Sequence, residues 1–134
     1  MLTPVNPPAG GFPGVSLGMR ISGGDLLILS GHVGTLPNGE LAEGFEAQLR
    51  ATYENIKATL HAAGAGFEAV ARLTHYVVDF DPSMLAILRS VRSEYINNDA
   101  PPSAALIPLV KLYDKAVLLE VDGFAVLPER RRID

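Results

Sequence analysis

Glu120 is the residue whose position most strongly suggests chemistry. It lies between Leu119 and Val121 in an otherwise apolar segment. Burying a carboxylate is costly unless it is paired or hydrogen-bonded, or unless its pKa rises. A strand that keeps Glu120 there holds it either for a structural partner or for a reaction, in which it would activate water as a general base. Asp122 follows two residues later on the same face, and we interpret it as a solvated strand end.

His32 is the second candidate, because it follows an apolar segment and opens a glycine-containing loop. Functional residues often lie where a strand meets a loop, and an imidazole exchanges protons near neutral pH. A packing role for His32 is the alternative. The hydroxyl of Ser30 and the backbone amide of Gly31 could line a small pocket beside it. His75 lies within a β-branched segment, which favours a structural role.

The composition predicts one folded domain that spans residues 1–134. Of the 134 residues, 48% are hydrophobic and 19% are charged, a balance that excludes disordered classes. The net charge of −4 argues against a nucleic-acid partner. The chain has no cysteine, and its three histidines show no metal-ligand spacing, so we expect no metal. Without a membrane-length apolar run or a recognisable signal peptide, we expect a cytoplasmic protein without a membrane partner.

Hydrophobic periodicity predicts the element order β-β-α-β-α-β-β. The proline- and glycine-rich residues 1–18 form an irregular arm with room for a short edge strand, and residues 128–134 form a tail. Residues 19–22 and 26–30 are expected to pair as a hairpin. The later strands are expected at residues 72–80, 103–110 and 116–126, and the helices at 43–63 and 81–96. Pro108 suggests an edge position or a bulge for its strand.

The last predicted strand is apolar on both faces up to Glu120. Two helices cover only one face of a sheet this small, so the other face must meet a partner or expose an apolar patch. A homo-oligomer formed through sheet faces is the physical expectation. The alternative is that the N-terminal arm covers the second face.

Three segments, taken in order, resemble the Rid family, which is also called the YjgF/YER057c/UK114 or endoribonuclease L-PSP group. Residues 26–34 (LLILSGHVG) resemble the family's apolar strand ending in Ser-Gly-Gln. Residues 45–65 resemble its first helix, and residues 101–122 resemble its C-terminal signature. The resemblance implies an α+β fold, with a mixed sheet carrying two helices on one face. It also implies a chorismate-mutase-like trimeric barrel with ligand clefts between subunits.

The resemblance further implies hydrolysis of reactive enamines and imines without a metal or organic cofactor. Ser30 matches the family's pocket serine, and Gly31 follows it. Glu120 matches the carboxylate that positions or activates water. His32 replaces the usual glutamine, and we expect it to protonate the leaving nitrogen or to orient the substrate.

The substrate-binding side departs from the family pattern. The family arginine that grips the substrate carboxylate is replaced here by Ala104 or Ala105, and the small residue two places later is replaced by Leu106 or Ile107. The family's pocket tyrosine has no clear match, and Val15 or Phe12 lies near its position. Each charge-assisted hydrogen bond of an arginine fork contributes roughly 1.5–3 kcal/mol. Its loss therefore predicts a less charged or more apolar ligand.

Two functions remain open. The first is a hydrolase of C=N or enamine bonds, acting on a 2-iminoalkanoate or an aminomuconate-type substrate. The second is a homotrimer that binds a small molecule without deaminase activity. The family's ribonuclease label is disfavoured by the negative charge.

Overall fold

The computed structural model describes residues 1–9 and 11–129, and most of the predicted tail lies outside them. The elements run in the order β1 (Leu2–Val5), β2 (Gly18–Ile21), β3 (Asp25–His32), α1 (Phe45–Ala62), a 3₁₀ turn (Phe67–Ala69), β4 (Val70–Val78), α2 (Met84–Ser93), β5 (Ser103–Leu109) and β6 (Leu119–Leu127). The predicted order of helices and strands is confirmed, and the arm contributes β1 as an additional strand.

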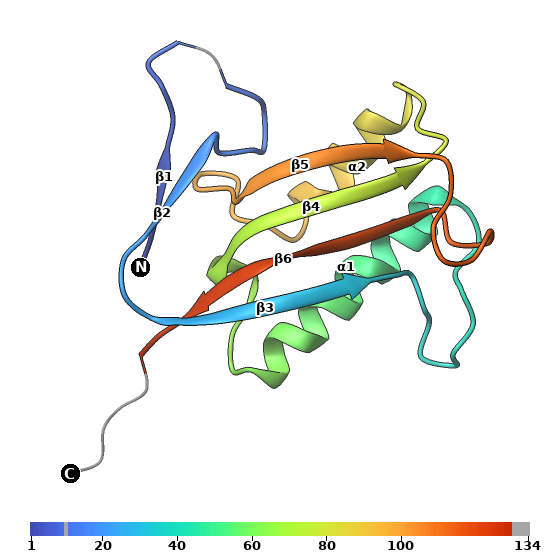
Figure 1. Cartoon of the computed structure of the whole chain (residues 1–134), viewed down its shortest axis with the longest axis horizontal. Coiled ribbons are helices and arrows are strands. Elements are labelled where there is room, and N and C mark those ends of the chain that lie inside the picture. Colours follow the sequence, from blue (N-terminus) through green and yellow to red (C-terminus); the bar gives the residue numbers. More distant parts are fainter. Residues whose placement is uncertain (10, 130–134) are drawn as a thin grey trace.

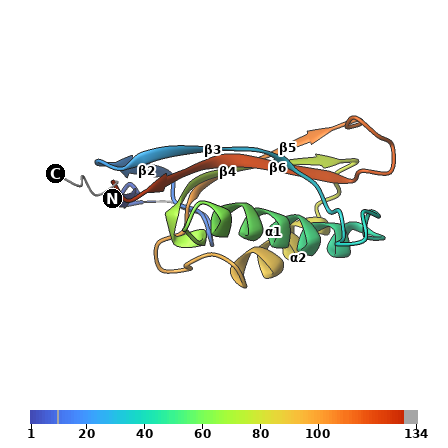
Figure 2. The ribbon, with the colours of Figure 1, turned by 90° about the horizontal axis from the view of Figure 1, so that it is seen from below.

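Four of these strands form a mixed sheet in the order β3-β6-β4-β5 (Figure 1). β4 and β5 are parallel, and β6 is antiparallel to both β3 and β4. α1 and α2 both lie on one face of this sheet (Figure 2). The α+β class and the helices on one face are therefore as predicted. Pro108 lies in β5 at the edge of the sheet, where a missing backbone donor is tolerated.

The predicted hairpin between β2 and β3 is wrong. β2 pairs with β1, with Leu2 opposite Ile21, whereas β3 pairs with β6. Gly23 and Gly24 have φ values of 71° and 90° and redirect the chain. A side chain on Gly24 would overlap the carbonyl oxygen of Leu127, so the turn lies directly against the end of β6. β2 has 4 residues and pairs with the short β1. β3 has 8 residues and pairs with β6, which is distant in the sequence.

The core lies between the sheet and α1. Its largest fully buried side chains alternate with outward-facing residues along β4 and β6 and recur every three or four residues along α1. They include Leu49, Tyr53, Ile56, Leu60, Leu73, Val77, Leu119 and Val121. This packing fixes which face each neighbouring side chain takes, and it directs Glu120 away from the helices.

The face of the sheet opposite the helices carries exposed apolar side chains. Leu26 and Ile28 of β3 are 61% and 68% exposed, and Ile107 of β5 and Phe124 of β6 are 43% and 41% exposed. The N-terminal arm, which could have covered this face, leaves these side chains open. This face of the sheet is thus partly apolar, but residues 116–118, from which this was predicted, precede β6, which begins at Leu119.

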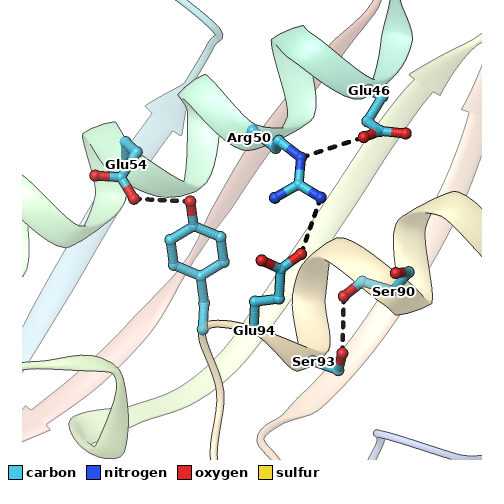
Figure 3. Close-up of polar contacts among 7 residues, drawn as sticks. Glu46, Arg50, Glu54, Ser90, Ser93 and Glu94 are labelled. Carbon is cyan, nitrogen blue, oxygen red and sulfur yellow. Dashed lines mark hydrogen bonds and ion pairs between the residues drawn. The ribbon is translucent and has the colours of Figure 1, made fainter.

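Polar contacts attach the end of α2 to α1 (Figure 3). Arg50 of α1 contacts Glu46 at 3.2 Å and Glu94 at 2.9 Å. The hydroxyl of Tyr95 donates a hydrogen bond of 2.7 Å to Glu54. Exposed ion pairs stabilise little by themselves, but together these contacts help to set the direction of α2 over the sheet.

Candidate functional site

The predicted site residues fall into two groups, one on β3 and β6 and the other beside the edge strand β5. The first, here called the Glu120 half, contains Glu120, Ser30, Gly31 and His32. The second, here called the cavity half, contains Val15, Ala104, Ala105 and Leu106. β6 and β4 separate β3 from β5, so the outer strands lie about 14 Å apart at ordinary strand spacing. A single chain therefore does not bring the two groups together.

Glu120 lies near the start of β6, opposite Tyr76 of β4. Leu119 and Val121 are fully buried on the helix side of the sheet. Glu120 therefore points to the face opposite the helices, here called the open face. Glu120 is half-buried, and in the described part of the chain its carboxylate makes no hydrogen bond and no ion pair. A Cβ atom on Gly31 would lie 2.7 Å from the carboxyl carbon of Glu120. The missing side chain at Gly31 thus leaves room for the carboxylate.

His32 points toward the helices. Its Nδ1 lies 2.6 Å from the carbonyl oxygen of Ser30, and its Nε2 lies 2.7 Å from the hydroxyl of Thr59 on α1. In the β3–β6 register, His32 lies opposite the buried Val121. His32 and Glu120 therefore occupy opposite faces of the sheet within one chain. The ring of His32 fastens the end of β3 to α1 and helps to hold Ser30.

Asp122 differs from the predicted solvated strand end. β6 continues beyond it to Leu127, and Asp122 is half-buried. The hydroxyl of Tyr76 donates a hydrogen bond of 3.3 Å to its carboxylate. Desolvation raises the pKa of Tyr76, and the nearby charges of Asp122 and Glu120 raise it further. Asp122 thus has a hydrogen-bonded partner, whereas Glu120 has none among residues 1–9 and 11–129.

The cavity half surrounds a cavity of about 320 Å³ between the arm, α2 and β5. All four residues of this group line it. The other lining residues come from the arm, β4 and α2 and are Phe12, Pro13, His75, Leu85, Leu88, Arg89 and Arg92. The two arginines were not among the predicted site residues. The available signal was their spacing of three residues on α2, which places both beside the apolar stripe.

Arg92 is a buried cation, with 5% of its surface exposed. Its Nη2 donates a hydrogen bond of 3.2 Å to the carbonyl oxygen of Pro13. A Cβ atom on Gly14 would lie 2.9 Å from the same nitrogen, so the arm packs closely on the guanidinium. Burial lowers the pKa of Arg92, the nearby Tyr53 opposes this shift, and the positive charge of Arg89 adds to it.

His75 forms the inner wall of the cavity and is 1% exposed. The hydroxyl of Tyr53 lies 2.7 Å from its Nε2, and the carbonyl oxygen of Ala105 lies 3.3 Å from its Nδ1. Because a carbonyl oxygen only accepts hydrogen bonds, Nδ1 carries the proton and Nε2 accepts from Tyr53. Burial lowers the pKa of His75 to about 4, and the charge of Arg92 contributes to the shift. The residue is therefore neutral at pH 7.

The buried His75 should make stability depend on pH. Its pKa falls from 6.5 to about 4 on folding, so the unfolded chain binds this proton at a higher pH than the folded chain. The contribution is fully present above about pH 6.5 and is lost as the pH falls toward 4, at a cost of about 3 kcal/mol. Urea unfolding at fixed protein concentration between pH 7 and pH 4 measures this loss. His75→Gln should show a shallower dependence, and an unchanged slope would contradict the assignment.

The described residues offer no group of three or more histidine, cysteine or acidic side chains arranged to hold a metal ion. In the same part of the chain, no helix combines the length and apolar character needed to cross a membrane.

Comparison with known proteins identifies the family of the chain. Residues 16–127 match the family model described as endoribonuclease L-PSP. A RutC family protein of Pyrococcus horikoshii is 33% identical over 107 residues, which cover 78% of this chain and 82% of that protein. The RutC family protein YjgH of Escherichia coli is 35% identical over 82 residues, which cover 61% of this chain and 60% of that protein.

Solved structures show the same fold. A Rid-family protein of unknown function from Yersinia pestis aligns with a TM-score of 0.88 and 28% identity, covering 94% of this chain and 98% of that one. A RidA protein from an Antarctic Psychrobacter aligns with a TM-score of 0.70 and 27% identity, covering 92% and 93%. The family match covers most of the chain in one continuous segment. The chain therefore belongs to the Rid/YjgF family, whose matching model carries the description endoribonuclease L-PSP.

Proposed function

We propose that this chain hydrolyses the C=N bond of a small imine, or of the enamine that gives rise to it, in a cleft between two copies. The observation that carries the proposal is the carboxylate of Glu120. It is half-buried on the open face of the sheet, it lacks a hydrogen-bonded partner in the described residues, and Gly31 leaves space beside it. A carboxylate in this setting is suited to accept a proton from water.

The second copy is required because the Glu120 half lies on β3 and β6, with Glu120 facing away from the helices, whereas the cavity half lies between β5 and α2. A contact between the β3 edge of one subunit and the β5 edge of its neighbour would bring a Glu120 half to a cavity half. The exposed Leu26, Ile28 and Phe124 supply apolar surface for such a contact. A homotrimer is the assembly that we expect.

The reaction follows from this arrangement. Glu120 takes a proton from water as the water oxygen bonds to the imine carbon, and it passes this proton to the imine nitrogen, which gives a neutral carbinolamine. Glu120 then takes the proton of the carbinolamine hydroxyl and delivers it to the nitrogen as the C–N bond breaks and the C=O bond forms. One imine and one water thus yield one carbonyl compound and one ammonia. His32 contributes by holding the carbonyl of Ser30, which keeps the end of β3 in place.

The direct test generates imines with an amino-acid oxidase and traps them with semicarbazide. Purified protein should lower the yield of trapped imine for at least one side chain in a panel of acidic, apolar and aromatic amino acids. Light scattering after gel filtration, run on the same preparation, should show three chains per particle. An absence of acceleration across the panel would overturn the proposed reaction, and a monomer with full activity would overturn the shared cleft.

Gly31→Ala tests the space that is reserved for the carboxylate. The new Cβ would lie 2.7 Å from the carboxyl carbon of Glu120, and the flexible end of that side chain would move aside. Misplacing a catalytic group by about 1 Å costs up to about 100-fold in rate, so kcat/KM should fall by about 10- to 100-fold. The free energy of unfolding should change by less than about 1 kcal/mol, because no backbone atom is displaced.

The matched control is Gly18→Ala in β2, where the new Cβ meets Val5 at an ordinary contact distance of 3.6 Å. It should leave kcat/KM unchanged. Adding Gly31→Ala to Glu120→Gln should cause no further loss, because the displaced carboxylate is already absent. A further loss in the double variant would assign Gly31 a role independent of Glu120.

A further inference from the structure

We propose that Arg89 and Arg92 of α2 form an anion-binding site in the cavity. This site would hold the carboxylate of a small ligand whose remaining body is apolar. As the ligand-binding part of the proposed cleft, it rests on the proposed function for its link to catalysis. It also replaces the expectation of a less charged ligand, which followed from Ala104 and Ala105.

The charge balance of the cavity supports an anion. Arg92 is 5% exposed, and its one described hydrogen bond, to Pro13, uses one of the five N–H donors of a guanidinium. Arg89 lies close enough for its positive charge to lower the pKa of Arg92. None of the residues that line the cavity is acidic. Burying a cation is costly unless it is paired, and a bound carboxylate would supply the missing negative charge.

The other polar groups of the cavity do not compete for this role. His75 is neutral, and both of its ring nitrogens are engaged, with Tyr53 and with the carbonyl of Ala105. The described ion pairs of the chain involve Arg50 and not the two arginines of α2. The guanidinium groups are therefore the polar groups of this cavity that remain available to a ligand.

The walls of the cavity define the rest of the ligand. They are mainly apolar and are formed by Phe12, Val15, Leu85, Leu88 and Leu106. A volume of about 320 Å³ lies at the small end of the range for ligand sites. The site therefore suits a monoanion with a short aliphatic or compact aromatic body. It disfavours a ligand that carries a second charge at the end away from the carboxylate.

Isothermal titration with a pair of isosteric probes tests this site. The probes are 4-methylpentanoate and 4-methylpentanamide, which share their shape and differ in charge. We expect the carboxylate to bind at least about 10-fold more tightly than the amide, and to bind more weakly as the salt concentration rises. Equal binding of the two probes, or binding of neither, would overturn the proposal.

Variants of the two arginines identify the binding groups. Arg89 is exposed, so Arg89→Gln should fold normally and should lower the affinity for the carboxylate by at least about 10-fold. The affinity for the amide should not change. Arg92→Lys keeps the buried charge but removes the planar guanidinium. It should therefore weaken the binding of the carboxylate probe without abolishing folding. Arg20→Gln alters an exposed arginine of β2 outside the cavity and should have no effect.

The two proposals fail in different ways. If imines are hydrolysed but Arg89→Gln changes neither KM nor the affinity for 4-methylpentanoate, the anion site is wrong and the reaction stands. If no imine is hydrolysed but the carboxylate binds in an arginine-dependent manner, the anion site stands and the reaction is wrong. Full carboxylate affinity in Arg89→Gln and in Arg92→Lys would remove the inference whatever the activity.

Discussion

Glu120→Gln is expected to lower kcat for imine hydrolysis by about 10²- to 10⁴-fold. The amide has the shape of the carboxylate, so binding and folding should be retained, but it cannot accept the proton of water. Because the carboxylate of Glu120 makes no hydrogen bond in the described residues, the substitution removes none. Single-turnover hydrolysis of the preferred imine, measured beside the thermal unfolding midpoint, separates a chemical defect from a folding defect.

Asp122→Asn is the matched control for this change. Asp122 lies two residues away on the same face of β6, but its carboxylate accepts a hydrogen bond from Tyr76. The asparagine side chain retains an oxygen that can accept the same bond. Its kcat should remain within about 3-fold of the wild type, because it carries no proton in the proposed reaction. A larger loss in Asp122→Asn than in Glu120→Gln would reverse the assignment of the two acids.

Gly123→Ala is expected to destabilise the fold by about 3 kcal/mol or more, or to prevent folding. The added Cβ would overlap the carbonyl oxygen of Arg72, where the β4–β6 register shifts between Val70 and Arg72. Both strands are central, so neither can move aside without disturbing a neighbouring strand. Urea unfolding measures the loss, with Gly18→Ala as the control for adding a methyl group to a strand glycine. Equal stability of the two variants would show that the register shift relaxes freely.

The helices and the core were predictable because their information is local. The three- and four-residue spacing of Leu49, Tyr53, Ile56 and Leu60 identifies the buried face of α1 without knowledge of its partner. The pairing of β2 and β3 was not predictable in this way. A glycine turn indicates where the chain changes direction. It does not show that β2 pairs with β1 and that β3 pairs with β6.

The candidate site was only partly accessible to sequence reasoning for the same reason. The position of Glu120 in an apolar strand is a local signal that the sequence displays directly. Arg89 and Arg92 gave no comparable signal, because an arginine on a helix is ordinarily solvated. Their place in the cavity depends on how α2 crosses β5 and on how the arm folds back over Arg92. These are tertiary contacts between distant segments.

The unlike edges of the sheet have a consequence for symmetry. A contact in which the β3 edge of one chain meets the β5 edge of another is heterologous, or head-to-tail. A two-fold dimer would instead place like edges together, so that each contact would join two halves of the same kind. An open head-to-tail chain leaves one unmatched half at each end, whereas a closed ring matches all of them. The proposed shared cleft would therefore call for a closed ring with one complete cleft for every chain.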